Sequence, residues 1–127
     1  MGRPPARDLT ERELEVMHAF WSGGPATAAA MRDRLAGSGL DRTYATIANL
    51  IRVLVEKGFL RPTNTERPFT YEVVRSFEDV SGRLLGDLVR RVFRGSRADL
   101  LCRLTAEKKL TAEERAVLEQ ILREAGR

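Results

Sequence analysis

The chain has 127 residues, 43% of them hydrophobic, which is enough for one domain or for a small domain with an appendage. Its net charge of +4 suits a polyanionic partner, and no apolar run approaches the ~18–20 residues that a bilayer-crossing helix needs. One cysteine, Cys102, excludes both a disulfide within the chain and a metal site made of cysteines alone. The N-terminus lacks the apolar segment of a secretory signal, so we expect a cytoplasmic protein.

A capping pattern predicts the first helix. Thr10 as N-cap and Glu13 three residues later form a capping box, with acids where the helix dipole favours them. Apolar residues follow at helical spacing as far as Trp21, which we expect to anchor the core, and Pro25 lies just beyond the end of the helix. Thr27 is a second candidate N-cap, before a short helix that ends in the glycine-bearing turn 36–39.

The segment 43–57 predicts an amphipathic third helix, which ends before Gly58. Its apolar residues recur at spacings of three, four and seven: Ile47, Leu50, Ile51, Leu54 and Val55. The opposite face carries hydrogen-bonding side chains of moderate reach, which can bond base edges and phosphates in a major groove. A core helix with a polar back is the alternative interpretation. A short helix, a glycine-bearing turn and such a helix follow the helix-turn-helix plan.

Two short strands are predicted next, at 59–63 and 68–74, joined by a polar connector that makes a hairpin. Pro62 and Pro68 cannot donate ladder hydrogen bonds, so we expect both at strand ends or on outward edges. Three helices and a hairpin form a winged helix-turn-helix, with Arg67 at the tip placed to reach a phosphate or a minor groove. A solvated turn that contains one arginine is the alternative.

The residues expected to contact DNA lie in and around the third helix. Base-edge or phosphate contacts are expected from four side chains: Thr43, Tyr44, Thr46 and Asn49. Contacts that position the protein on the DNA backbone are expected from five basic residues: Arg42, Arg52, Lys57, Arg61 and Arg67. For Arg52, a core acid is the alternative partner.

From residue 77 onwards the sequence predicts only helices, and a second capping box, formed by Thr111 and Glu114, opens the last of them. The apolar stripes of this part have few partners within the chain, and a helical piece of about 50 residues is marginally stable alone. We therefore expect a winged-helix domain at 1–75 and a helical dimerisation domain at 76–127, with a homodimer formed through 77–124. The predicted interface residues are Leu84, Leu85, Leu88, Val92, Leu100, Leu101, Leu104, Leu118, Ile121 and Leu122. Two-fold symmetry would place two reading helices one DNA turn apart, as a palindromic operator requires.

Several motifs taken together resemble those of the BlaI/MecI penicillinase-repressor family. They are Leu14-Glu15-Val16-Met17, Trp21, Gly24-Pro25, Thr27, the segments 46–47 and 50–60, Arg67 and Phe69-Thr70-Tyr71 in the wing, and Arg94-Gly95-Ser96, Leu100-Leu101 and 109–114 in the tail. The resemblance covers about residues 8–124, and the motifs are specific as a set although each is weak singly.

The resemblance implies a dimeric transcriptional repressor on palindromic operators ahead of β-lactamase or resistance genes. It also implies a membrane-bound sensor metalloprotease as a partner, whose action leads to cleavage within the dimerisation region. By match of position, Thr43 and Thr46 fall where the family's recognition helix touches DNA, and Arg67 falls at its wing arginine.

Three departures from the family pattern qualify these implications. Glu66 stands where a wing glycine is expected, and it adds a negative charge near phosphate. In an ungapped match Arg103-Leu104 replaces the Asn-Phe bond that is cut in the staphylococcal members, so release by cleavage at that bond is left open. The copper-responsive relatives that resemble CopY carry paired cysteines near the C-terminus, and Cys102 alone excludes metal sensing by that device.

No catalytic constellation or phosphate-binding loop is present in the sequence, so we expect neither an enzyme nor a cofactor. His18 has no further metal ligand at suitable spacing. We expect Cys102 to be a small buried residue, with a redox-sensing thiol as the alternative. Gly82 and Gly86 would permit close helix approach at a dimer seam, or simply mark a bend.

Two other functions remain as alternatives. One is a winged-helix protein-interaction module, which would lack the steep salt dependence of phosphate contacts. The other is a ligand-sensing regulator without cleavage-based release, which would need a pocket in the helical tail.

Overall fold

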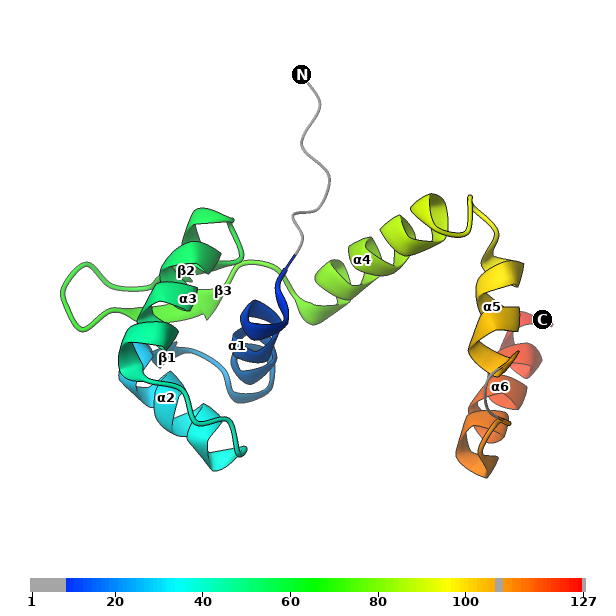
Figure 1. The fold of residues 1–127 in the computed structure, drawn as a ribbon, viewed down its shortest axis with the longest axis horizontal. Helices are drawn as coiled ribbons and strands as arrows, with labels where there is room; N and C mark the ends of the chain where they lie inside the picture. The colour runs from blue at the N-terminus through cyan, green and yellow to red at the C-terminus, as the bar shows by residue number, and fades with distance from the viewer. Residues whose placement is uncertain (1–8, 107–108, 127) are drawn as a thin grey trace, which may run out of the picture. The chain divides into compact units, whose positions relative to one another are not determined.

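The computed structural model describes residues 9–106 and 109–126. Its elements are, in chain order, α1 (Glu11–Gly23), β1 (Ala26–Thr27), α2 (Ala28–Gly37), α3 (Tyr44–Glu56), β2 (Leu60–Pro62), β3 (Thr70–Val73), α4 (Phe77–Arg91), α5 (Arg97–Ala106) and α6 (Ala112–Ala125) (Figure 1). The prediction of a mainly helical protein with a small hairpin is confirmed. Among these described helices none has the length and apolar character required to cross a membrane.

Threonines start four of the helices. At α1 the hydroxyl of Thr10 accepts a hydrogen bond from the Glu13 N–H at 3.1 Å, and the Glu13 carboxylate accepts one from the Thr10 N–H at 3.0 Å. A second capping box, between Thr111 and Glu114, starts α6. Both boxes are predicted from the sequence, and both satisfy N–H groups that the first turn leaves without a helical partner.

The core of the winged helix lies between α1, α2, α3 and the sheet. Ile47, Ile51 and Leu54 of the predicted α3 stripe are buried, whereas Leu50 and Val55 pack at its edge. Their burial directs the opposite side of α3 to solvent, since a helix buries one stripe and exposes the other.

The sheet has three antiparallel strands in the order β1-β3-β2. The predicted hairpin is β2–β3, in which Arg61 pairs with Glu72. Strand β1 is not predicted from the sequence, because Ala26 and Thr27 form a strand only through their pairing with Tyr71 and Thr70. The loop between β2 and β3 projects beyond the ends of these strands and forms the wing (Figure 1).

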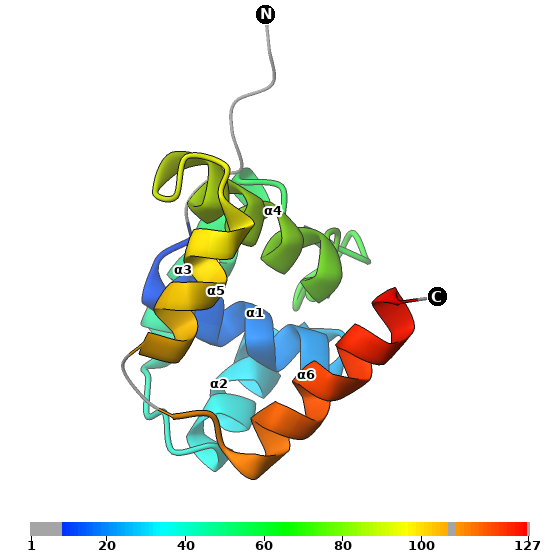
Figure 2. The same cartoon turned by 90° about the vertical axis from the view of Figure 1, so that its right-hand side faces the viewer.

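The chain divides into two compact units, which meet within α4, after Leu84. Val80, 4% exposed, belongs to the winged-helix core, and Leu84 packs against that core. Leu84, predicted as a dimerisation residue, thus has a place in the first unit. Whereas the predicted domain boundary lies before α4, the packing makes the first two turns of α4 part of the winged helix. Helix α4 runs through this boundary without a break, as Figure 1 shows, and Figure 2 gives the view turned by 90°.

The unit that begins at Leu85 buries none of its described side chains within the chain. Its exposed large apolar residues are Leu85, Leu88, Val92, Leu101, Leu104, Val117, Leu118, Ile121 and Leu122. The expectation of a buried Cys102 is wrong for the single chain: the thiol is exposed, because α5 buries no residue.

Candidate nucleic-acid interface

The N-terminus of α3 is held by Thr43. Its hydroxyl oxygen accepts a hydrogen bond from the Thr46 N–H at 3.1 Å, and its hydroxyl lies 2.9 Å from the Thr46 Oγ1 and donates to it. The preceding turn includes Gly39 with φ +87°, a left-handed conformation that glycine adopts without strain. Thr43 therefore has a structural role as an N-cap in addition to the predicted DNA contact.

The outward face of α3 carries Asn49 and Arg52. The Arg52 guanidinium donates hydrogen bonds to the Asn49 side-chain oxygen at 2.7 Å and to the Glu56 carboxylate at 2.7 Å. Arg52 thus pairs with an exposed acid on its own helix, and not with a core acid. Tyr44 is half exposed at the start of this face, and Thr46 is partly buried at its edge.

Ala45 belongs to the same face and is absent from the predicted contacts. It precedes Asn49 by four residues and Arg52 by seven, so the three share one side of the helix, and all are exposed. An alanine methyl suits contact with a thymine methyl in the major groove. An alanine has no polar group that would mark it as a DNA contact in the sequence, so only its spacing and its exposure together indicate this role.

Two of the predicted phosphate contacts are tied into the fold. The guanidinium of Arg42 donates to both carboxylate oxygens of Glu15 at 3.1 Å, and the Lys57 ammonium lies 2.7 Å from the Glu13 carboxylate. These pairs join the two ends of α3 to α1. Contact of Arg42 or Lys57 with DNA remains a prediction, and it would compete with an existing ion pair.

The environment of Glu13 favours its charged form. Burial by itself raises the pKa of Glu13, but hydrogen bonds from the Lys57 ammonium and the Thr10 N–H outweigh it and bring the pKa below its ordinary value. The carboxylate that anchors Lys57 is therefore ionised at neutral pH.

The wing is organised by Asn64. Its amide nitrogen donates to the carbonyls of Glu66 and Pro68 at 3.0 and 3.1 Å, and its side-chain oxygen accepts from the Thr70 N–H at 2.9 Å. The sequence pattern places Asn64 in the connector without revealing this role, although asparagine commonly bonds nearby backbone in turns. The bonds define the conformation of the loop that carries Arg67.

Arg67 differs in its charge partner from the other residues predicted to contact the DNA backbone. Its guanidinium lies over the Phe69 ring, 5.8 Å from the centroid, and it is exposed. Arg61 pairs with Glu72 across the strands at 2.6 Å. Among the ion pairs of the described residues, Arg67 is the member of the predicted basic set that has no carboxylate partner. Its charge is therefore available to a phosphate.

His18 in α1 is the one histidine of the chain. It is exposed, and its ring centroid lies 5.3 Å from that of Trp21 and 6.0 Å from that of Phe77. No group of three potential metal ligands occurs among the residues that the structure describes.

Two solved structures share this arrangement of elements. RosR of H. salinarum is 17% identical, with 95% of this chain and 96% of that chain covered and a TM-score of 0.54. The complex structure of hsRosR-SG is 14% identical, with 96% of each chain covered and a TM-score of 0.52. The reduced form of MarR from E. coli, with 20% identity over 93% and 78% of the two chains, reaches a TM-score of 0.47 and adds nothing to the assignment. The two RosR structures show the fold.

A comparison with curated proteins finds no matching sequence. A family model described as penicillinase repressor matches residues 9–124, which include every described element up to the last turn of α6. With a winged helix whose α3 presents polar side chains to solvent, the chain belongs to the penicillinase repressor family of DNA-binding transcriptional repressors.

Proposed function

We propose that the protein is a homodimeric repressor that binds a palindromic operator, with α3 in the major groove and the wing on the flanking backbone. An α-helix fits the major groove, and dimeric helix-turn-helix proteins read two half-sites about one helical turn apart. The cytoplasm is the compartment in which we expect it to act.

The observation that carries the proposal is the bare apolar surface of the second unit. Leu88, Val92 and Ile121, for example, are 40%, 63% and 53% exposed in the single chain. Exposed apolar surface on this scale marks an interaction site, and a second copy offers the same surface in return. Burial in a dimer would give α5 and α6 the core that the single chain does not supply.

Within the operator complex we assign two kinds of contact. Tyr44, Thr46 and Asn49 read base edges, and the methyl of Ala45 meets a thymine methyl. Thr43 combines its cap with a contact at the start of α3. Arg52, Arg61 and Arg67 position the protein on phosphates, Arg52 and Arg61 by exchanging a carboxylate for a phosphate.

For release from the operator, we propose that cleavage by a partner membrane protease requires a bond other than the Asn-Phe bond of the staphylococcal members. Arg103-Leu104 stands at that position and lies inside α5. A protease selective for Asn-Phe would leave the chain intact. Mass spectrometry of the protein after exposure of its host cells to a β-lactam would identify any bond that is cut.

The test starts from a randomised duplex library, from which the full-length protein selects its operator. Fluorescence anisotropy then compares the selected duplex with a scrambled one across a salt series, and sedimentation velocity gives the number of protomers bound. Support requires an inverted repeat, two protomers per duplex, and a slope of log affinity against log salt of about −0.9 per phosphate contact. Equal, weak binding to both duplexes would exclude the repressor and favour a protein-interaction module.

A further inference from the structure

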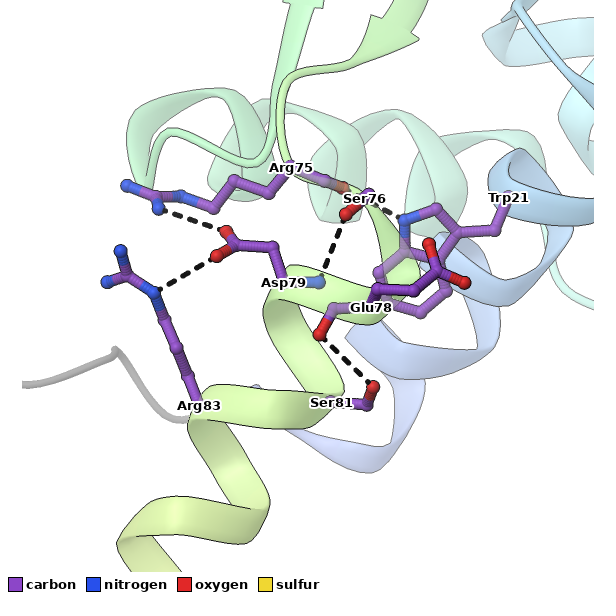
Figure 3. Close-up of polar contacts among 7 residues, drawn as sticks. All are labelled: Trp21, Arg75, Ser76, Glu78, Asp79, Ser81 and Arg83. Atoms are coloured by element: carbon purple, nitrogen blue, oxygen red, sulfur yellow. Dashed lines mark hydrogen bonds and ion pairs between the residues drawn. The ribbon is translucent and has the colours of Figure 1, made fainter. Parts of the chain in front are cut away.

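Contacts made by Arg75 and Asp79 hold the start of α4 against the winged helix. The indole N–H of Trp21 in α1 donates to the backbone carbonyl of Arg75 at 3.0 Å. The Arg75 guanidinium lies 5.7 Å from the centroid of the Phe59 ring and 3.5 Å from the Asp79 carboxylate. The other oxygen of Asp79 lies 3.3 Å from the Nε of Arg83, one turn further along α4 (Figure 3). We call Trp21, Arg75 and Asp79 the latch.

The other contacts at the start of α4 are a helix cap and apolar packing. Ser76 caps α4 through its hydroxyl, which accepts from the Asp79 N–H at 3.0 Å. Val80 is the buried residue of α4, and Phe77 contributes an edge contact with the Trp21 ring at 5.3 Å. In addition, Leu84 packs against the core and the His18 ring centroid lies 6.0 Å from that of Phe77. Apolar contacts are not directional, so the hydrogen bond and ion pairs of the latch limit the swing of α4 about them.

We propose that the latch fixes the direction in which α4 leaves the winged helix, and thereby sets the half-site separation that the dimer accepts. In this sense its three members are positioning residues, because none of them belongs to the predicted DNA contacts. The proposal rests on the homodimeric repressor proposed above, because α4 is the helix that runs from the winged helix into the second unit.

The geometry of DNA makes the direction of α4 decisive. One added base pair moves a half-site by about 3.4 Å and rotates it by about 34°. With 15 residues and a rise of about 1.5 Å per residue, α4 is a lever of about 22 Å. A change of about 10° in its direction displaces the far end by about 4 Å, which is one base-pair step. A swing of about ten degrees thus covers the translation between neighbouring spacings, whereas the rotation of about 34° requires a larger change in the direction of α4.

Two glycines, Gly82 and Gly86, follow the latch residue Asp79 along α4. A methyl group added at Gly82 or Gly86 would meet no atom within 4 Å, so neither glycine is required by close packing in the single chain. Glycine weakens a helix interior relative to alanine. Because the latch holds the turns before them, it makes those turns move with the winged helix.

The test compares Asp79→Asn with Glu78→Gln in the full-length protein. Asp79→Asn removes the ion pairs to Arg75 and Arg83. Glu78→Gln removes the same charge from the same exposed turn, where no ion pair of the Glu78 carboxylate occurs among the described residues. The probes are duplexes that carry the selected half-site once, or as inverted repeats whose separation increases in single base pairs.

We expect wild type and Glu78→Gln to prefer one separation. Since an exposed ion pair contributes up to about a factor of five, that preference should shrink about two- to fivefold in Asp79→Asn. Affinity for the single half-site and the melting temperature should stay within about twofold and a few degrees of wild type, because α3 and the wing are untouched. Trp21→Phe, which keeps an aromatic ring but removes the N–H donor, should broaden the spacing profile in the same sense.

Four results separate the latch from the proposed function. Failure to select any half-site would exclude the repressor itself. If half-sites are bound and Asp79→Asn and Trp21→Phe keep the wild-type spacing profile, the latch inference is wrong and the repressor stands. The inference is equally overturned if the wild type accepts all separations alike. A loss confined to the single half-site would mean that Asp79 acts on the winged helix and not on α4.

Discussion

The Lys57 ammonium lies 2.7 Å from the Glu13 carboxylate and joins the end of α3 to the first turn of α1. Glu13 is 5% exposed and also closes the capping box with Thr10. One carboxylate therefore contacts both the start of α1 and the far end of α3, and it helps to fix the orientation of α3.

Replacing Lys57 by methionine should destabilise the protein. Removing one partner from a buried ion pair leaves an uncompensated charge, which here, with Lys57 partly exposed, should cost about 2–3 kcal/mol in free energy of unfolding. Urea denaturation at pH 7 measures the loss. Arg32→Met, which removes an exposed pair with Asp33, is the matched control and should cost less than about 1 kcal/mol. Equal effects of the two substitutions would contradict a structural role for the Lys57 pair.

Acid should reduce the difference between wild type and Lys57→Met. Burial raises the pKa of Glu13, but the hydrogen bonds from Lys57 and Thr10 bring it below its ordinary value. A depressed folded-state pKa gives stabilisation that is complete above the unfolded value of about 4.3 and is lost as the pH falls through the folded value. The stability gap should therefore be largest near pH 7 and shrink below about pH 4. A gap that widens in acid would contradict this assignment.

Substitutions of Thr43 separate its cap from its predicted DNA contact. Thr43→Ala removes the acceptor of the Thr46 N–H and should cost about 1 kcal/mol of stability, whereas Thr43→Ser keeps the acceptor and should cost little. If operator affinity falls in Thr43→Ser as well, after correction for stability, the methyl group contacts DNA. Thermal unfolding and anisotropy on the selected operator give the two readouts. A Thr43→Ala protein as stable as the wild type would show that the cap contributes little to the free energy of unfolding.

Arg67→Ala should weaken binding to every duplex alike and reduce the salt slope by about one unit, because we propose that the wing guanidinium contacts phosphate. The neighbouring substitution Glu66→Gln should act in the opposite direction, since it removes a negative charge from the same loop. Anisotropy titrations across a salt series test both. A loss on the operator alone, with nonspecific affinity unchanged, would assign Arg67 to base or groove recognition instead.

Asn49→Ala should mainly relax sequence preference. A good amide contact to adenine contributes about 1–3 kcal/mol of discrimination, so repeating the selection with the variant should flatten one position of each half-site. Thr46→Ala is expected to act in the same way at another position. Loss of affinity that is equal on all sequences would move either residue from base recognition to the phosphate contacts.

Ile121→Asp should convert the dimer into monomers and abolish the advantage of two half-sites over one. The side chain is 53% exposed on α6, so the substitution changes little in the single chain but buries a charge in a dimer. Sedimentation equilibrium measures the association, and anisotropy measures the half-site comparison. A variant that remains dimeric would place the interface elsewhere on the second unit.

The sequence by itself determines the elements whose causes are local. The threonine caps of α1 and α6, the apolar stripe of α3 and the hairpin all depend on residues within a few positions of one another, and each is confirmed. Motif order over most of the chain also identifies the family. Tyr44, Asn49 and Arg52 are exposed as the helical period of α3 predicts.

Only the tertiary structure decides how distant residues combine. Arg42 and Lys57 look like phosphate contacts by charge and position, yet they meet Glu15 and Glu13, acids 27 and 44 residues away. Strand β1 exists only through its pairing with β3. The division of α4 at Leu84 and the latch at Arg75 likewise depend on which surfaces α1 presents to the start of α4. Sequence periodicity reports which face of an element is apolar, whereas the partner of each face is set when the elements pack together.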